Sequence, residues 1–219
     1  MAGAVFSGER KLSKAGDVLA EDAPLEVRGK DHPWVSRGGI KLDHGLAHFG
    51  FDVAGAVALD VGSSTGGFTD VLLSRGAAKV YAVDVGTNQL AWKLRRDPRV
   101  IMHEQTNART LGADIIRERI DIVVCDASFI GLAKVLEAPL KLAKPSAKLV
   151  ALIKPQFEAG REEVGKAGVV RDPAIHERVC TEAKGWVESR GWTVLGVVPS
   201  PITGPQGNVE FLLGGEKHA

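Results

Sequence analysis

Residues 56–67 read Ala56-Val-Ala-Leu-Asp60-Val-Gly-Ser-Ser-Thr-Gly66-Gly67, an apolar run that ends near a carboxylate and passes into a glycine-rich turn. The run has the length and composition of a buried strand, and glycines after a strand allow the backbone to turn and to approach a ligand closely. The residues from Phe68 onward then open a helix. A strand, a glycine-rich loop and a helix in this order predict an α/β fold with a ligand at the carboxyl end of the strand.

Outward from this unit, short apolar or β-branched runs alternate with helical segments. The predicted strands are 56–61, 79–83, 100–103, 121–125, 148–153, 192–199 and 208–213, and the two best-defined helices are 39–50 and 173–190. A long polar loop is expected between Pro155 and Arg171, and the turn-rich segment 200–207 joins the last two strands into a hairpin. This order predicts a doubly wound, mostly parallel sheet with one antiparallel strand near its end.

The first loop differs from the G-x-G-x-x-G pattern of dinucleotide-binding folds, because its spacing is Gly62-Ser-Ser-Thr-Gly66. This spacing favours a ligand that has no pyrophosphate to place on the helix N-terminus. The next predicted strand ends in Asp84, at the place where a carboxylate usually accepts hydrogen bonds from ribose hydroxyls. The loop and the acid together predict a nucleoside-containing ligand.

Composition excludes several classes of protein. Lys and Arg number 28 against 27 Asp and Glu, so any attraction to nucleic acid must come from local clustering of charge. The two cysteines, Cys125 and Cys180, are too far apart in sequence to suggest a thiolate metal site, and a reduced cytoplasmic setting is expected. No apolar run approaches the ~20 residues of a membrane span, and the charged start does not resemble a signal peptide.

Five short stretches carry a resemblance to a known family. They are Ser36-Arg-Gly-Gly-Ile-Lys41, Asp60-Val-Gly-Ser-Ser-Thr-Gly-Gly67, Asp126-Ala-Ser128, Lys154-Pro-Gln-Phe-Glu158 and Asn208-Val-Glu210. With these motifs the chain resembles the TlyA-type haemolysin A family, whose catalytic domain is an FtsJ-like ribosomal RNA 2′-O-methyltransferase. The resemblance implies the Rossmann-like fold of class I S-adenosylmethionine-dependent methyltransferases, with a seven-stranded, mostly parallel sheet and an antiparallel strand in the terminal hairpin.

The resemblance also implies two parts of the chain. Residues 33–219 form the methyltransferase domain, and residues 1–32 are a remnant of a small RNA-binding domain plus a linker, without that domain's two opening helices. The strand-like pieces of this first part are Asp17-Val-Leu19 and Pro24-Leu-Glu-Val-Arg28.

The implied cofactor is S-adenosyl-L-methionine, with its amino-acid end near the first loop. Asp84 is expected at the ribose, Asn107 near the adenine, and Asp126 at the end of the fourth strand of the methyltransferase domain. The full set of predicted cofactor-binding residues is Asp60, Gly62, Ser63, Thr65, Gly66, Gly67, Phe68, Asp84, Asn107 and Asp126. No metal site is predicted, because His44 and His48 have helical spacing but no third ligand is evident.

The family's proposed Lys-Asp-Lys-Glu tetrad corresponds to Lys41, Asp126, Lys154 and Glu210. Our hypothesis is that Lys154 accepts or steers the proton of the acceptor hydroxyl, that Asp126 orients Lys154, and that Lys41 and Glu210 position the hydroxyl. Burial and a neighbouring cation would favour a neutral Lys154 amine, whereas Asp126 would favour the ammonium. The residues alone leave open whether Lys154 is the base or only holds the ribose.

The predicted activity is methyl transfer to a ribose 2′-hydroxyl of ribosomal RNA, with ribosomal RNA or ribosomal subunits as partners. A non-catalytic RNA- or ribosome-binding protein and a haemolysin are the alternatives. The glycine-rich stretch Phe157–Gly168 suits either a loop that closes over RNA or a disordered connector. Oligomeric state is left open. Candidate phosphate contacts are Arg37, Lys93, Arg95, Arg96, Arg161 and Lys166, and Trp34 or Phe157 are candidates for stacking a base.

Overall fold

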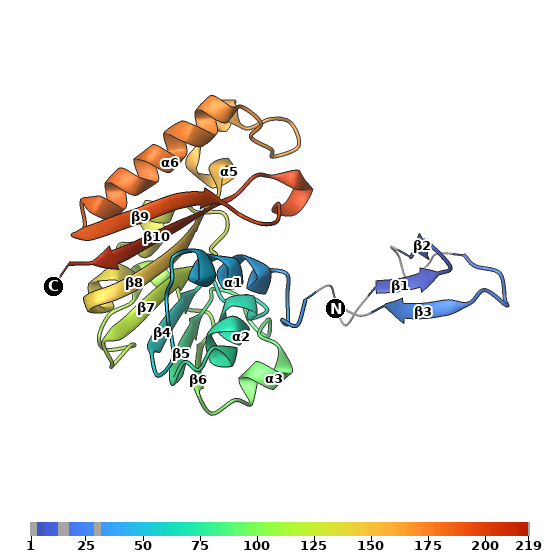
Figure 1. The fold of residues 1–219 in the computed structure, drawn as a ribbon, viewed down its shortest axis with the longest axis horizontal. Coiled ribbons are helices and arrows are strands. Elements are labelled where there is room, and N and C mark those ends of the chain that lie inside the picture. The colour runs from blue at the N-terminus through green and yellow to red at the C-terminus, as the bar shows by residue number, and fades with distance from the viewer. Residues whose placement is uncertain (1–3, 13–17, 29–31, 219) are drawn as a thin grey trace.

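The computed structural model describes residues 4–12, 18–28 and 32–218, whose helices and strands are drawn in Figure 1. The strands are β1 (Ala4–Ser7), β2 (Arg10–Lys11), β3 (Leu25–Arg28), β4 (Val57–Val61), β5 (Lys79–Val83), β6 (Val100–His103), β7 (Ile120–Cys125), β8 (Ala143–Ile153), β9 (Trp192–Pro199) and β10 (Phe211–Lys217). The α-helices are α1 (Gly38–His48), α2 (Gly67–Ser74), α3 (Trp92–Arg95), α4 (Leu132–Leu136), α5 (Pro155–Glu158) and α6 (Pro173–Glu188). None of these helices has the length and apolar character needed to cross a membrane.

The large sheet has seven strands in the order β6-β5-β4-β7-β8-β10-β9. The pairs from β6 to β8 are parallel, whereas β10 is antiparallel to both of its neighbours. The order reverses beside β4, so the carboxyl ends of β4 and β7 flank the crevice where open α/β sheets bind ligands. The predicted mostly parallel sheet with one antiparallel strand in the closing hairpin is confirmed.

Helices cover both faces of this sheet, as Figure 1 shows. On one face α1 and α2 pack over an apolar core that includes Leu46 and Val150. On the other face α4 and α6 pack over a second core that includes Leu149 and Val187. Burial of a layer on each face makes β7 and β8 apolar along most of their length, which is why these strands are recognisable as continuous hydrophobic runs.

The predicted bounds of β4, β5, β6, β7 and β9 agree with the structure to within one residue. β5, β6 and β9 have the predicted bounds, and β4 and β7 differ by one residue. β8 begins five residues earlier than predicted, because Ala143 already pairs with Ile120 before the chain bulges through Ser146, which has a positive φ of 59°. β10 begins at Phe211 instead of residue 208, because the Asn208 backbone and side chain bond to neighbouring loops.

The segment 155–171 is not a featureless loop. It contains α5 and a 3-10 turn, Arg161–Glu163. Asn208 fixes the next part of the segment, since its side chain donates to the Gly168 carbonyl at 3.0 Å and accepts from the Val170 N–H at 3.3 Å. Side-chain and backbone bonds therefore hold this segment in place beside the end of β9 and the start of β10.

The amino-terminal strands form a separate three-stranded antiparallel sheet in the order β2-β1-β3. β3 matches the predicted strand at Pro24–Arg28, but β1 and β2 were not predicted. The other expected strand is wrong in its described part, since Val18 and Leu19 belong to no strand and Asp17 lies outside the described residues. The assignment of residues 1–32 to an RNA-binding domain stays a prediction.

Candidate active site

Two cavities lie at the carboxyl ends of the parallel strands. The first has a volume of about 680 Å³ and includes Lys41, Lys154 and Glu210 in its lining. The second has a volume of about 530 Å³ and includes Asp84 and Asn107. The cavities adjoin each other, because five residues line both: Gly62, Ser64, Asp126, Ser128 and Phe129.

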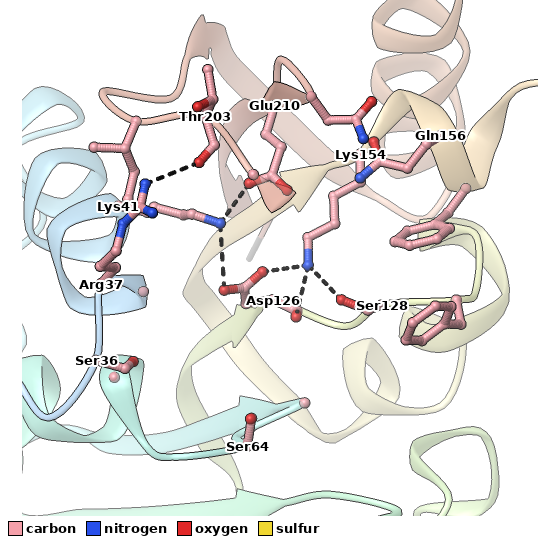
Figure 2. Close-up of a pocket in the computed structure, with 18 of the residues that line it drawn as sticks. Ser36, Arg37, Lys41, Ser64, Asp126, Ser128, Lys154, Gln156, Thr203 and Glu210 are labelled. Carbon is pink, nitrogen blue, oxygen red and sulfur yellow. Dashed lines mark hydrogen bonds and ion pairs between the residues drawn. The ribbon is translucent and has the colours of Figure 1, made fainter. Parts of the chain in front are cut away.

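The four predicted catalytic residues meet in the first cavity (Figure 2). Asp126 lies between the two lysines, with its Oδ1 2.6 Å from Lys154 Nζ and its Oδ2 3.9 Å from Lys41 Nζ. Lys41 Nζ also donates to Glu210 Oε2 at 2.5 Å. The four side chains therefore form one continuous chain of charges, Lys154, Asp126, Lys41 and Glu210.

The topology of the sheet explains this convergence. Asp126 follows β7, Lys154 follows β8, and Glu210 precedes β10, and these three strands are neighbours. Because β10 runs antiparallel to β8, its start lies at the same edge as the end of β8, with Phe211 paired to Ile153. Lys41 comes from the first turn of α1, which packs on β8 and β10.

Burial makes the pairing of these charges necessary. Lys41 and Lys154 are 7% and 6% exposed, and Glu210 is 1% exposed. An unpaired ion at such positions would be strongly destabilising, whereas here two cations balance two anions. Glu210 Oε1 faces Gly204, where a Cβ atom would lie only 2.2 Å from that oxygen. Glycine is required at position 204 for the Glu210 side chain to occupy this place.

Lys154 has a full set of hydrogen-bond acceptors. Besides the Asp126 carboxylate, Nζ donates to the Asp126 backbone carbonyl at 3.1 Å and to Ser128 Oγ at 2.9 Å. An ammonium group has three N–H donors and no acceptor, so these partners saturate it. Ser128 was not among the predicted site residues, although it belongs to the Asp126-Ala-Ser128 motif. It lines both cavities and supplies the uncharged side chain in this set.

The second cavity is lined by groups suited to a nucleoside. Asp84 Oδ2 accepts from the Ser64 N–H at 2.8 Å and Oδ1 accepts from the Gly86 N–H at 2.7 Å, which fixes the carboxylate at the end of β5. Each carboxylate oxygen keeps acceptor capacity for a ribose hydroxyl. Asn107 lines the same cavity, and its Oδ1 accepts from the Arg109 N–H at 3.0 Å.

The glycine-rich loop after β4 separates the two cavities. Gly62 has a φ of 80°, a left-handed conformation that favours glycine, and a Cβ there would lie 2.9 Å from the Ala127 backbone. Gly62 and Ser63 both donate backbone N–H bonds to the Val83 carbonyl, which anchors the loop to β5. The loop can therefore present a bare backbone to a ligand that extends from one cavity into the other.

Comparison with known proteins agrees with this geometry. The model of the FtsJ-like methyltransferase family matches residues 34–217. The chain belongs to this family.

Relatives of this FtsJ-like methyltransferase cover most of its length. The 16S/23S rRNA (cytidine-2′-O)-methyltransferase TlyA of Mycobacterium tuberculosis is 51% identical over 85% of this chain and 70% of its own. Hemolysin A of Brachyspira hyodysenteriae is 39% identical over 97% of this chain and 88% of its own. A solved structure titled "Putative hemolysin from Streptococcus thermophilus" has 43% identity and a TM-score of 0.86, covering 99% of this chain and 79% of that one.

Two of the predicted cofactor residues of this FtsJ-like methyltransferase line neither cavity. Gly66, at the end of the loop, faces the Leu90 and Leu94 side chains, and Asp60 is fully buried, where its Oδ2 accepts from Thr69 Oγ1 at 2.6 Å. Burial raises the pKa of Asp60 to about 7, against the lowering effect of the Thr69 hydrogen bond. Asp126 and Asp84 add smaller repulsions that raise it further. The other eight predicted cofactor residues line one cavity or both: Gly62, Ser63, Thr65, Gly67, Phe68, Asp84, Asn107 and Asp126.

The candidate phosphate contacts differ in how far their charge is already neutralised. Lys93 pairs with Asp70 at 2.8 Å and Arg95 pairs with Glu104 at 3.0 Å, so ion pairs already neutralise these two cations. In the described part of the chain, Arg161 and Lys166 have no ion pair, and both are exposed. These two remain the better candidates for contacts with a polyanion.

The remaining candidates lie close to the first cavity or are packed within the chain. Arg37 lines this cavity and donates to the Thr203 carbonyl at 3.3 Å, whereas the Arg96 guanidinium lies over the Trp92 ring. Of the two candidate stacking residues, Phe157 lines the first cavity, where its ring centroid is 5.2 Å from that of Phe129. Trp34 is partly buried and packs against the apolar core under α1.

Proposed function

We propose that this FtsJ-like methyltransferase transfers a methyl group from S-adenosyl-L-methionine to a ribose 2′-hydroxyl of ribosomal RNA. The observation that carries the proposal is the tetrad, whose buried Lys41, Lys154 and Glu210 line the first cavity and whose Asp126 lines both cavities. The activity named for the mycobacterial relative at 51% identity supports the same reaction. Ribosomal RNA or ribosomal subunits are then the partners, and the enzyme would work with ribosomes in the cytoplasm.

The residues of both cavities fit the proposed cofactor. Asp84 would hold the ribose hydroxyls and Asn107 would lie near the adenine, both in the second cavity. The bare backbone at Gly62 would admit the methionine part toward Ser63 and Thr65 in the first cavity. When bound, the cofactor supplies a methyl group on a positively charged sulfur, and this methyl group passes to an oxygen nucleophile that attacks in line with the carbon–sulfur bond.

The tetrad would act on the acceptor hydroxyl. A ribose hydroxyl is a weak nucleophile, so its orientation and the removal of its proton are the tasks left to the protein. Lys154 lines the first cavity beside Asp126 and Ser128, which line both, and would hold the hydroxyl oxygen or take its proton, while Asp126 fixes the direction of the amine. Lys41 and Glu210, tied to each other and to Asp126, would position the ribose from the other side.

The state of Lys154 decides between these two roles. With three acceptors around it, the ammonium form is satisfied and would donate to the ribose oxygen after displacing Ser128. A neutral amine has two N–H donors and one lone pair, so it could instead keep its bonds to the two Asp126 oxygens, give up its bond to Ser128 and accept the ribose proton on the lone pair. Ser128 therefore takes part in the proposal in either case.

The test is methyl transfer to unmodified bacterial ribosomal subunits with radiolabelled S-adenosylmethionine, followed by digestion of the RNA and location of the label. Wild-type protein should place the label on ribose, and Lys154→Ala should lose it while retaining cofactor binding in calorimetry. Lys184→Ala is the matched control, because Lys184 is an exposed lysine of α6 whose partner is Glu188. If the wild-type protein binds the cofactor but places no label on the RNA, the proposal is overturned in favour of an RNA-binding role.

A further inference from the structure

We infer that Glu158 is a positioning residue for methyl transfer, because it holds the segment that carries Ser128 against the turn that carries Lys154. The inference rests on the proposed function for its kinetic consequence. Its structural part concerns residues 126–131, which link β7 to α4 without regular structure, and residues 154–158, which follow β8. The relative position of these two segments determines whether Ser128 can reach Lys154.

Glu158 makes the contact that closes the far end of this junction. Its Oε1 accepts from the Leu132 N–H at 2.7 Å. Leu132 is the first residue of α4, and Gly131 before it has no side chain that could cap the free N–H groups of that helix. The carboxylate of Glu158 thus supplies the missing acceptor from another segment.

The two segments approach each other closely along their whole length. At one end Lys154 contacts Asp126 and Ser128, and in the middle the rings of Phe129 and Phe157 lie 5.2 Å apart. At the Glu158 end, a Cβ added to residue 131 would lie 3.1 Å from Glu158 Oε2. The Glu158 hydrogen bond is the last of three ties, so its removal frees one side of the link.

The backbone between these ties needs support. Phe129 has a φ of 66°, a left-handed conformation that is uncommon for a bulky residue, and its side chain is 90% exposed. A strained residue keeps its conformation only where the surroundings hold it. Burial of the Phe129 ring supplies little of this support, so the ties on either side must. Without the Glu158 tie, the segment can relax and move Ser128 away from Lys154.

Glu163 offers a matched comparison within the same region. Its Oε2 accepts from the Gly160 N–H at 2.8 Å, and it pairs with Arg178. It is therefore another carboxylate bonded to a backbone N–H on the chain after β8, but its hydrogen bonds go to Gly160 and Arg178 and not to residues 126–132. The Gly160 and Arg178 bonds lower the pKa of Glu163, whereas burial raises the pKa of Glu158.

The experiment measures kcat, KM for RNA and cofactor affinity in Glu158→Ala, Glu158→Gln and Glu163→Ala. We expect Glu158→Ala to lower kcat by about 10- to 100-fold, the size of effect that a displaced catalytic group produces. Cofactor affinity should change much less, since Asp84 and the Gly62 loop are anchored by other bonds. Glu158→Gln keeps an acceptor oxygen and should recover most of kcat, and Glu163→Ala should keep wild-type kcat.

A second readout does not depend on the reaction. Amide hydrogen exchange across residues 127–136, followed by mass spectrometry, should be faster in Glu158→Ala than in wild type, and near wild type in Glu158→Gln and Glu163→Ala. Unchanged exchange in Glu158→Ala, equal losses of kcat in the alanine and glutamine variants, or an equal loss in Glu163→Ala would each overturn the inference. If wild type itself transfers no methyl group, the proposed function fails and hydrogen exchange alone decides whether the tie exists.

Discussion

The two adjoining cavities are built from different kinds of group. Apart from the shared Asp126, the second cavity presents backbone segments and the acid Asp84, mostly from consecutive units of the chain between β4 and the residues after β6. The first cavity presents charged side chains from four distant places, and the Lys41–Glu210 pair alone spans 169 positions. The second cavity therefore depends on local turns, whereas the tetrad depends on the complete sheet.

This difference implies that the two cavities should respond separately to substitution. A change in the tetrad should alter methyl transfer or folding and leave cofactor affinity nearly intact. A change at Asp84 should instead weaken cofactor binding and leave transfer at saturating cofactor nearly intact. The shared boundary at Gly62, Ser64, Asp126, Ser128 and Phe129 is where the separation should fail.

The largest effect is expected at Lys154. Lys154→Ala removes the group that we propose meets the acceptor hydroxyl, and it should lower the single-turnover rate by about 10²- to 10⁴-fold, the range of proton-transfer contributions. Calorimetry should show cofactor affinity within a few-fold of wild type. A rate close to wild type would contradict the role of Lys154, and a large drop in cofactor affinity would break the separation of the cavities.

The buried pair should affect stability next. Lys41→Met leaves Glu210 without its counter-ion and should lower the free energy of unfolding by about 3–5 kcal/mol in urea titrations. Adding Glu210→Gln should recover most of this stability without restoring transfer, because the charge that lacked a partner is gone. Purely additive losses in the double variant would show that the two side chains do not act as a pair.

Asp60 should make stability depend on pH. The pKa of Asp60 is about 7 in the folded chain, whereas the ordinary pKa of an Asp side chain is 3.8. Between these two pH values the folded state keeps a proton that the unfolded chain releases. The contribution of Asp60 to the free energy of unfolding is therefore fully present at low pH and disappears as pH rises from about 4 to about 7. Compared with Asp60→Asn, wild type should lose about 4 kcal/mol over this range. Parallel stability curves for the two proteins would contradict this assignment.

Asp84 should affect cofactor affinity. Asp84→Ala removes the proposed ribose acceptor and should weaken cofactor binding by about 10- to 100-fold, as expected for hydrogen bonds to a charged group. Transfer at saturating cofactor should stay within a few-fold of wild type. Asp97→Ala is the control, since Asp97 also accepts from a nearby backbone N–H, that of Arg99, but lines neither cavity.

The smallest effect concerns the surface around the sites. Replacing Arg161 and Lys166 by alanine should weaken RNA binding and lower its salt dependence, by about 0.7–0.9 in the log–log slope for each phosphate that the protein no longer neutralises. Replacing Lys93 and Arg95 should change the slope less, because Asp70 and Glu104 already neutralise them. The opposite ranking, measured by filter binding at several salt concentrations, would locate the RNA on the α3 side.

Sequence patterns predicted the fold where burial on both faces imposes continuous apolar runs, as in β5 and β7. They failed where an element buries little, as in β1 and β2, or where side chains interrupt the pairing. The stretch from Asn208 has the apolar alternation of a strand, but Asn208 instead bonds to Gly168 and Val170. Such hydrogen bonds come from segments about 40 residues away and are not visible in a local pattern.

The predicted tetrad rested on motifs, and the structure brings all four residues together. What the motifs could not supply was the order of contacts, with Asp126 between the lysines and Ser128 completing the set around Lys154. The burial of Asp60 could not be predicted from the sequence either, because a carboxylate at the end of a strand can face either the ligand or the core. Only the packing of α2, through Thr69, fixes it inward.

The position of β10 in the sheet determines when the fold can be completed during synthesis of the chain. A ribosome synthesises this strand after all the other strands of the sheet, yet it fills the gap between β8 and β9. Until then the two strand edges that β10 pairs with, one of β8 and one of β9, lack their partner, and Lys41 lacks Glu210. The tetrad can therefore be complete only after Glu210 and β10 have been made and inserted between β8 and β9.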